Sequence, residues 1–363
     1  MMNTPFFCAI IVFGIISSSH SLSPSITKPK PSLFAKASPI AFGTLNPTYD
    51  ESPEGIANLL EALPSGTLID TAEKYGTKDG DAEIALGAAL RILGEKRKDE
   101  APDLLLCSKF APKPWRLSSD SVVEACQSSI ERLGVNSLDL YQLHFSDAVS
   151  QPFKLFGYTD NKDEIYWEGL AKCYHEGLVK NIGVCNYGPQ NIRKAHEFFS
   201  KMDVPLVSNQ INFNLMRYRS SMETKQACDE LGIQVSGYHP LGSGVLTGAY
   251  DEEWFSKIPG GLNKQKSKST RVRWYQKNCA PIIDAVRDVA DRRGKKTSHV
   301  AINWCICKGI IPICGARNTE QVLDALGGAT DEKGSWRLSG SEADELDAAS
   351  DASAEFARGF ELI

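Results

Sequence analysis

Short apolar runs alternate with longer amphipathic stretches along most of the chain. The runs are bounded by Gly, Pro, Asn or Asp, and they have the length of strands that are buried on both faces. They lie at residues 39–44, 67–70, 103–109, 138–144, 179–185, 206–210, 233–238 and 310–315. This pattern predicts eight strands of a parallel β-sheet.

The stretches between these runs have the spacing of amphipathic helices. In residues 121–134 apolar side chains recur on one face, and Gly134 is typical of a helix end. Residues 81–94 show the same spacing, and Gly94 predicts the end of that helix. Further helices are expected at residues 162–177, 189–199 and 222–231.

Eight strands with intervening helices and no internal linker predict the α/β class, as a single-domain (β/α)8 TIM barrel. An open, doubly wound sheet is the alternative. Such a sheet usually carries a G-x-G-x-x-G loop after its first strand, and Gly43 has no such loop around it. In a barrel, functional side chains gather where the strands end, at the C-terminal face.

The N-terminal region has a different composition from the rest. Residues 5–16 form an apolar run that is too short to span a bilayer comfortably and typical of a signal-peptide core. Residues 19–37 are rich in Ser, Pro and Lys, and no acidic residue precedes Asp50. We therefore expect a signal-like segment at 1–18, a transit-like segment at 19–37, both part of a disordered leader, and the barrel at 38–363.

A two-part leader of this kind predicts delivery to the plastid stroma. A plain secretory signal with a disordered linker is the alternative, as is a cytoplasmic location. The formal net charge of -5 gives no indication of nucleic acid as a partner, and we expect no stable membrane association of the mature protein.

The ten cysteines are too sparse for a disulfide scaffold, which indicates a reducing compartment. Cys305 and Cys307 lack a matching second pair, so we expect no metal site. The oligomeric state is left open by the sequence.

Four residues at strand ends or in the following turn can do chemistry together. Asp70, Lys109 and His144 end neighbouring strands, and Tyr75 lies in the turn after the first of them. A Lys next to a Tyr favours the phenolate, so we expect a lowered Tyr75 pKa, and an Asp keeps the Lys charged. The Tyr could then deliver a proton, and the His could donate a hydrogen bond to a substrate oxygen. Each residue alone could be structural.

The motifs around these residues resemble the aldo-keto reductase superfamily. "IDTAEKYG" resembles its D-T-A-x-x-Y-G signature, and "SSIERLGVNSLDLYQLH" resembles the stretch that leads to its catalytic His. "GLVKNIGVCNYG", "SNQINFNL", "GYHPLGSGVLTG" and "IPICGARNTEQV" resemble further family segments in the same order. The resemblance covers about residues 39 to 350 and is closest to plant-like chloroplast aldo-keto reductases.

This resemblance implies NADPH-dependent reduction of a small-molecule aldehyde or ketone on a TIM barrel. Tyr75 would be the proton donor, Lys109 would tune it, Asp70 would hold Lys109, and His144 would orient the carbonyl. The alternative is a nicotinamide-binding sensor or regulatory subunit with little turnover.

The resemblance also implies the cofactor contacts. Asn186 and Gln210 would hold the carboxamide, Tyr238 would stack on the nicotinamide ring, and Arg317 would contact the 2′-phosphate. The remaining implied contacts are Cys185, Pro240, Leu241, Gly242, Ser243, Gly244, Gly315, Ala316, Gln321 and Asp324.

Three positions depart from the family pattern. Cys185 replaces a Ser, and a thiol is the weaker hydrogen-bonding group. Ala325 replaces an Asn expected near the adenine, and His239 replaces a small residue. Two loops would complete the site: residues 145–161, whose Phe153, Phe156 and Tyr158 suggest an apolar pocket, and the basic residues 263–277, with Arg271 or Arg273 near the phosphates.

Overall fold

Eight parallel strands form a closed barrel in which every strand pairs with the next one in sequence and β8 pairs with β1. The computed structural model describes residues 33–35, 37–44, 52–146, 163–249, 253 and 276–353. The strands are β1 (Ala41–Gly43), β2 (Leu68–Asp70), β3 (Leu105–Phe110), β4 (Leu140–Leu143), β5 (Ile182–Cys185), β6 (Leu206–Asn212), β7 (Gln234–Tyr238) and β8 (Ile311–Cys314). The TIM barrel and all eight predicted strands are thereby confirmed.

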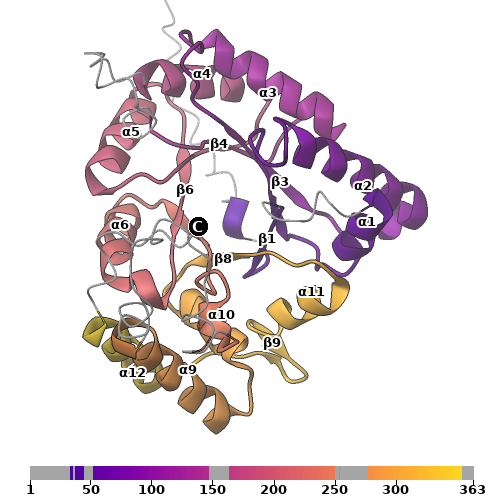
Figure 1. Ribbon diagram of the computed structural model, residues 1–363. Helices are drawn as coiled ribbons and strands as arrows, with labels where there is room; N and C mark the ends of the chain where they lie inside the picture. Colours follow the sequence, from indigo (N-terminus) through magenta and orange to yellow (C-terminus); the bar gives the residue numbers. More distant parts are fainter. Residues whose placement is uncertain are drawn as a thin grey trace, which may run out of the picture. The chain divides into compact units, whose positions relative to one another are not determined.

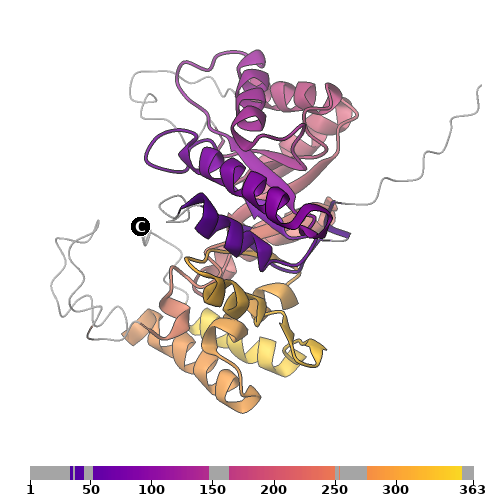
Figure 2. The ribbon, with the colours of Figure 1, turned by 90° about the vertical axis from the view of Figure 1, so that its right-hand side faces the viewer.

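The helices surround the strands, as Figure 1 shows. They are α1 (Pro53–Glu61), α2 (Asp81–Arg97), α3 (Asp120–Leu133), α4 (Asp163–His175), α5 (Pro189–Lys201), α6 (Tyr218–Glu230), α9 (Ala280–Arg293), α10 (Thr297–Cys307), α11 (Thr319–Leu326) and α12 (Gly340–Ala352). Single turns of 3-10 helix are η1 (Leu33–Ala35), η2 (Lys98–Glu100), η4 (Leu215–Arg217) and η5 (Val245–Thr247), and β9 (Thr330–Asp331) pairs with β10 (Gly334–Ser335). Figure 2 shows the C-terminal helices α9, α10 and α12, in orange and yellow, packed together.

Local signals explain most helix ends. Gly134 takes the left-handed conformation at φ 69° and ends α3, as the sequence predicted. The predicted end of α2 at Gly94 was wrong, because the helix continues to Arg97. The residues after Gly94 are good helix formers, and Lys96 is held by an ion pair with Glu61 of α1 at 2.5 Å.

The lower half of the barrel interior is apolar. Its buried side chains are Ala41, Leu68, Cys107, Leu140 and Ile313. Leu33 and Phe34 of η1 pack against this layer from the N-terminal side of the strands, and the short indigo turn lies within the ring of strands in Figure 1. η1 thus packs against the barrel although it precedes residue 38, where we expected the barrel to begin; the division into leader and barrel stays a prediction.

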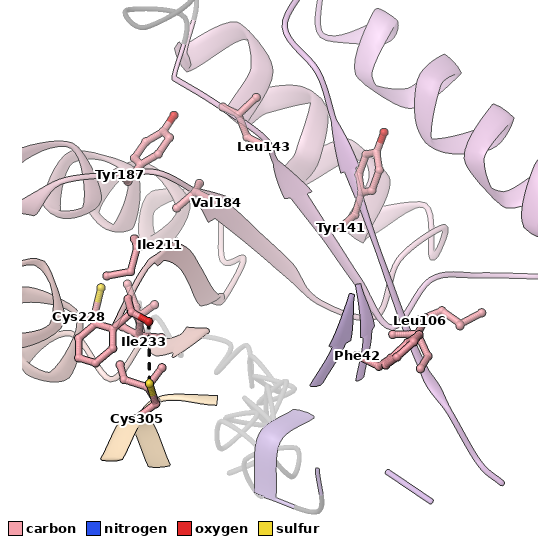
Figure 3. Packing of buried hydrophobic residues seen from close by; sticks show 14 of the residues in the cluster. Phe42, Leu106, Tyr141, Leu143, Val184, Tyr187, Ile211, Cys228, Ile233 and Cys305 are labelled. Atoms are coloured by element: carbon pink, nitrogen blue, oxygen red, sulfur yellow. Dashed lines mark hydrogen bonds between the residues drawn. The ribbon is translucent and has the colours of Figure 1, made fainter. Parts of the chain in front are cut away.

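The outward-facing side chains of the strands pack against the helices. Figure 3 shows Tyr141 and Leu143 of β4 and Val184 of β5 pointing away from the barrel interior. None of the helices in the described part of the chain could serve as a membrane-spanning segment. The burial of both sheet faces explains why the strands have continuous apolar runs.

Candidate active site

The Lys109 ammonium group is the centre of the polar upper half of the barrel. Its side chain is 0% exposed, and its Nζ lies 2.8 Å from the Asp70 carboxylate. It also donates to the Thr71 carbonyl oxygen at 2.9 Å and to the Tyr75 hydroxyl at 3.0 Å. An ammonium has three N–H donors, so these three acceptors satisfy it completely.

The Tyr75 hydroxyl is the one acceptor of Lys109 that can itself donate. Because the ammonium can only donate, the Tyr75 oxygen accepts, and its own proton is left for another acceptor. The expected lowering of the Tyr75 pKa was wrong: burial raises this pKa well above its usual value, and the opposing effect of Lys109 is smaller. Tyr75 therefore keeps its proton at neutral pH in the free protein.

The charge on Lys109 is equally well fixed. Burial acts to lower the pKa of Lys109, but Asp70 and Tyr75 outweigh burial and raise this pKa above its usual value. Gln210 Nε2 donates to Asp70 Oδ1 at 2.7 Å, which gives the carboxylate a further partner. We call Asp70, Tyr75, Lys109 and His144 the tetrad. It thus has a charged ion pair, Lys109 with Asp70, next to the neutral phenol of Tyr75.

The His144 imidazole lies beside the Tyr75 ring. The two ring centroids are 5.5 Å apart in an edge-on arrangement, and Phe145 stacks on the other side of His144 at 4.3 Å. Burial, with a contribution from the charge of Lys109, holds the pKa of His144 well below its usual value, so the ring is neutral. Its Nδ1 is completely buried and has no hydrogen-bond partner among the described residues.

The structure brings Asn186 and Tyr238 to the same rim. Asn186, in the left-handed conformation at φ 64°, donates from Nδ2 to the His144 carbonyl oxygen at 3.1 Å. Its Oδ1 accepts from the Tyr238 hydroxyl at 2.8 Å. A carboxamide held by Asn186 would therefore compete with Tyr238.

Cys185 takes part in the same network. Asn186 Nδ2 donates to its Sγ at 3.2 Å, and the thiol contacts Gln210 Oε1 at 3.7 Å. Burial raises the pKa of Cys185 to about 12, so it is a neutral thiol. The long sulfur contact leaves Gln210 Oε1 with hydrogen-bonding capacity for a ligand.

The loop after β7 contains Pro240 and Leu241 and then three residues in the left-handed region, Gly242, Ser243 and Gly244. The amides of Gly242 and Gly244 donate to carbonyl oxygens within this loop, at 2.8 and 3.0 Å. His239 lies edge-on to the Tyr238 ring at 5.2 Å and contacts the Ser243 hydroxyl at 3.2 Å. This loop therefore presents an exposed Ser243, which contacts His239.

The segment from β8 into α11 places Gly315 and Arg317 at the surface and Ala316 in the core. Gln321 folds back, so that its Oε1 accepts from the Arg317 amide at 2.8 Å. Asp324 is paired within the protein, with Lys296 at 2.5 Å and His299 at 3.1 Å. Gln321 and Asp324 are among the cofactor contacts that the resemblance implies, and in this structure both have partners within the chain itself.

Sequence reasoning missed two buried polar residues of the site. Glu73 accepts from the Ala111 amide at 2.5 Å and from Arg116 Nη2 at 2.8 Å, and so fastens the loop after Lys109 to the turn that carries Tyr75. Gln142 lies in the barrel interior between Cys107 and Gln210. A polar residue on the inward side of the apolar run 138–144 was the available signal for Gln142.

The two loops expected to complete the site fall largely outside the described residues. These are 145–161, with Phe153, Phe156 and Tyr158, and 263–277, with Arg271 and Arg273. The described residues contain no cluster of three or more side chains that could hold a metal ion.

Comparisons with known proteins agree with this geometry. The sequence profile of the aldo/keto reductase family matches residues 39–349. The chain is 38% identical over 290 residues to a chloroplastic pyridoxal reductase of Arabidopsis thaliana, which covers 79% of this chain and 73% of that protein. It is 28% identical over 298 residues to a probable aldo-keto reductase 1 of Glycine max, with 80% of each chain covered.

A solved aldo-keto reductase of Bombyx mori in complex with NADP has the same fold. It superposes with a TM-score of 0.61 at 20% sequence identity, and the match covers 85% of this chain and 88% of that one.

The neutral, buried His144 predicts a specific pH dependence of stability. Because its folded pKa lies below the unfolded value of about 6.5, the unfolded chain binds the proton first as pH falls. Stability linked to His144 is therefore present above that value and lost below it. Between pH 7.5 and 5.5 the wild type should lose about 1.4 kcal/mol more than His144→Asn, measured by urea unfolding. Equal losses in the two proteins would show that His144 is not held neutral.

Proposed function

The chain belongs to the aldo/keto reductase family, and we propose that Tyr75 donates the proton in an NADPH-dependent reduction of aldehydes or ketones to alcohols. The observation that carries this assignment is the hydrogen bond from Lys109 to the Tyr75 oxygen. The three N–H groups of Lys109 already have acceptors. Of the protons on Lys109 and Tyr75, the phenolic proton is therefore the one left for a substrate.

Bound NADPH would supply the hydride that reaches the carbonyl carbon. The residues of the chain handle the oxygen and its proton. His144, held neutral by burial, orients the carbonyl oxygen by a hydrogen bond from a ring N–H group. Tyr75 transfers its proton to that oxygen, and Lys109 stabilises the phenolate left behind, which then takes a proton from solvent.

The other implied cofactor contacts become part of this proposal. Gln210 Oε1 and Asn186 would hold the carboxamide, Tyr238 would stack on the nicotinamide ring, and Arg317 would contact the 2′-phosphate. The exposed Arg317 and the half-exposed Tyr238 leave room for these roles. Asp324 and Gln321 would need to exchange their internal partners for adenosine contacts.

The similarity to a chloroplastic pyridoxal reductase makes pyridoxal the first candidate substrate. Aldehydes from lipid peroxidation are the second. A purified protein assayed with NADPH and NADH against a panel of such carbonyls would rank them.

The proton-donor assignment is tested by Tyr75→Phe. This change should lower kcat by about 100-fold or more, because a positioned acid contributes at least that factor. NADPH binding, measured by fluorescence titration, should be retained. Tyr141→Phe is the matched control, since the Tyr141 hydroxyl is buried on the outer face of β4 without a partner among the described residues, and it should leave kcat unchanged.

Unchanged turnover of Tyr75→Phe would show that another group donates the proton. Tight NADPH binding by the wild type, with no carbonyl-dependent loss of NADPH, would instead support the sensor function.

The preference for NADPH over NADH is tested by Arg317→Ala. Loss of a charge-assisted contact to the 2′-phosphate should weaken NADPH binding by about 10-fold or more and leave NADH binding unchanged. Arg97→Ala is the control, because Arg97 lies at the C-terminal end of α2 and pairs there with Glu61. An equal loss for both cofactors would remove Arg317 from the 2′-phosphate site.

We further propose that the protein works in the plastid, supported by the composition of residues 1–37 and by the chloroplastic relative. A fluorescent protein fused behind residues 1–37 should enter plastids of an algal cell, and one fused behind residues 1–18 should stop in the secretory pathway. Secretion of both fusions would contradict plastid delivery.

A further inference from the structure

Gln142 is a fully buried amide in the interior of the barrel. Its neighbours along β4, Tyr141 and Leu143, point outward to the helices (Figure 3), so Gln142 points inward. No part of its side chain is exposed, and both ends of the amide must therefore find partners within the protein. Gly183 of β5 leaves room for it, since a Cβ there would lie 3.1 Å from Gln142 Cγ.

The partners of Gln142 determine which way its amide points. Its Nε2 donates to Ser208 Oγ at 3.1 Å and faces the Val184 carbonyl oxygen at 3.5 Å. A carbonyl oxygen can only accept, so the nitrogen of Gln142 must be on that side. Its Oε1 then faces Cys107 and Gln210, and it accepts from Gln210 Nε2 at 3.4 Å.

This orientation is passed on to Gln210. The nitrogen of Gln210 has two acceptors on one side, Asp70 Oδ1 at 2.7 Å and Gln142 Oε1. A single acceptor would allow the amide to pivot about that contact, and the second one fixes its plane. Gln210 Oε1 must therefore face the opposite side, toward Cys185, whose thiol is a distant partner at 3.7 Å.

We propose that Gln142 is a positioning residue for cofactor recognition: it fixes the plane of the Gln210 amide, so that Gln210 Oε1 points in the direction in which it selects the N–H of the nicotinamide carboxamide. This inference rests on the proposed function, in which Gln210 contacts that carboxamide. Gln142 is fully buried, so its influence on the cofactor passes through the orientation of Gln210.

The experiment compares the binding of NADP+ and of its 3-acetylpyridine analogue, in which a methyl group replaces the carboxamide NH2. Dissociation constants are measured on the whole protein by quenching of tryptophan fluorescence, so no turnover is needed. The wild type should prefer NADP+ by about 10-fold, because the analogue leaves Gln210 Oε1 unpaired. In Gln142→Leu this preference should fall to about 3-fold or less.

Asn209→Leu is the matched control. Asn209 is a fully buried amide next to Gln210 on β6, but it bonds to Tyr187 on the outer side of the strand. Both changes remove a buried amide and should lower the melting temperature. Asn209→Leu should keep the preference for NADP+. If Gln142 had only a structural role, Gln142→Leu would keep this preference as well. If Gln142→Leu does not fold, Gln142→Met is measured in its place, because methionine keeps the length of the side chain and removes the same amide atoms.

Gln210→Leu separates the two levels of the proposal. If the wild type shows no preference, or if Gln210→Leu keeps it, the carboxamide role of Gln210 is wrong and the role of Gln142 falls with it. If Gln210→Leu loses the preference while Gln142→Leu and Gln142→Met keep it, the role of Gln210 stands and that of Gln142 is refuted.

Discussion

A buried ammonium group that must satisfy three N–H donors without water is the constraint on which the site depends. Lys109 meets it with the Asp70 carboxylate, the Thr71 carbonyl oxygen and the Tyr75 hydroxyl. Removing one partner of such a buried pair costs about 3–5 kcal/mol, because the other charge is left uncompensated. These contacts hold together the C-terminal ends of β2 and β3 and the turn after β2. They also leave the Tyr75 proton free to be donated away from Lys109.

The rest of the barrel is arranged around this requirement. Below the ion pair the interior is apolar and is covered by Leu33 and Phe34, so Lys109 has no path to solvent from that side. Beside it, the neutral amide of Gln210 donates to Asp70, and Gln142 accepts from Gln210, so these contacts add no further buried charge. Outside the strands, Glu73 and Arg116 join the loops that carry Tyr75 and follow Lys109. The packing of the barrel interior therefore also determines the geometry of the proposed catalytic residues.

Periodicity located all eight strands, because strands buried on both faces have a continuous apolar run with sharp ends. Strand ends also indicated the tetrad, since parallel strands bring these residues to one face. Spacing could not reveal that Asp324 pairs with Lys296, or that Gln142 bonds to Gln210 across the interior, because these partners are distant in sequence. The sign of the Tyr75 pKa shift also escaped prediction, since it depends on how burial compares with the effect of Lys109.

The protonation state of Tyr75 tests the account most directly. Carbon-13 NMR of the tyrosine ring, with the Tyr75 resonance assigned by its loss in Tyr75→Phe, can follow ionisation during a pH titration of the free protein. An unperturbed tyrosine is half ionised at a pH of about 10. The account predicts that Tyr75 still holds its proton there, because burial outweighs the effect of Lys109. Ionisation of Tyr75 at or below that pH would contradict it.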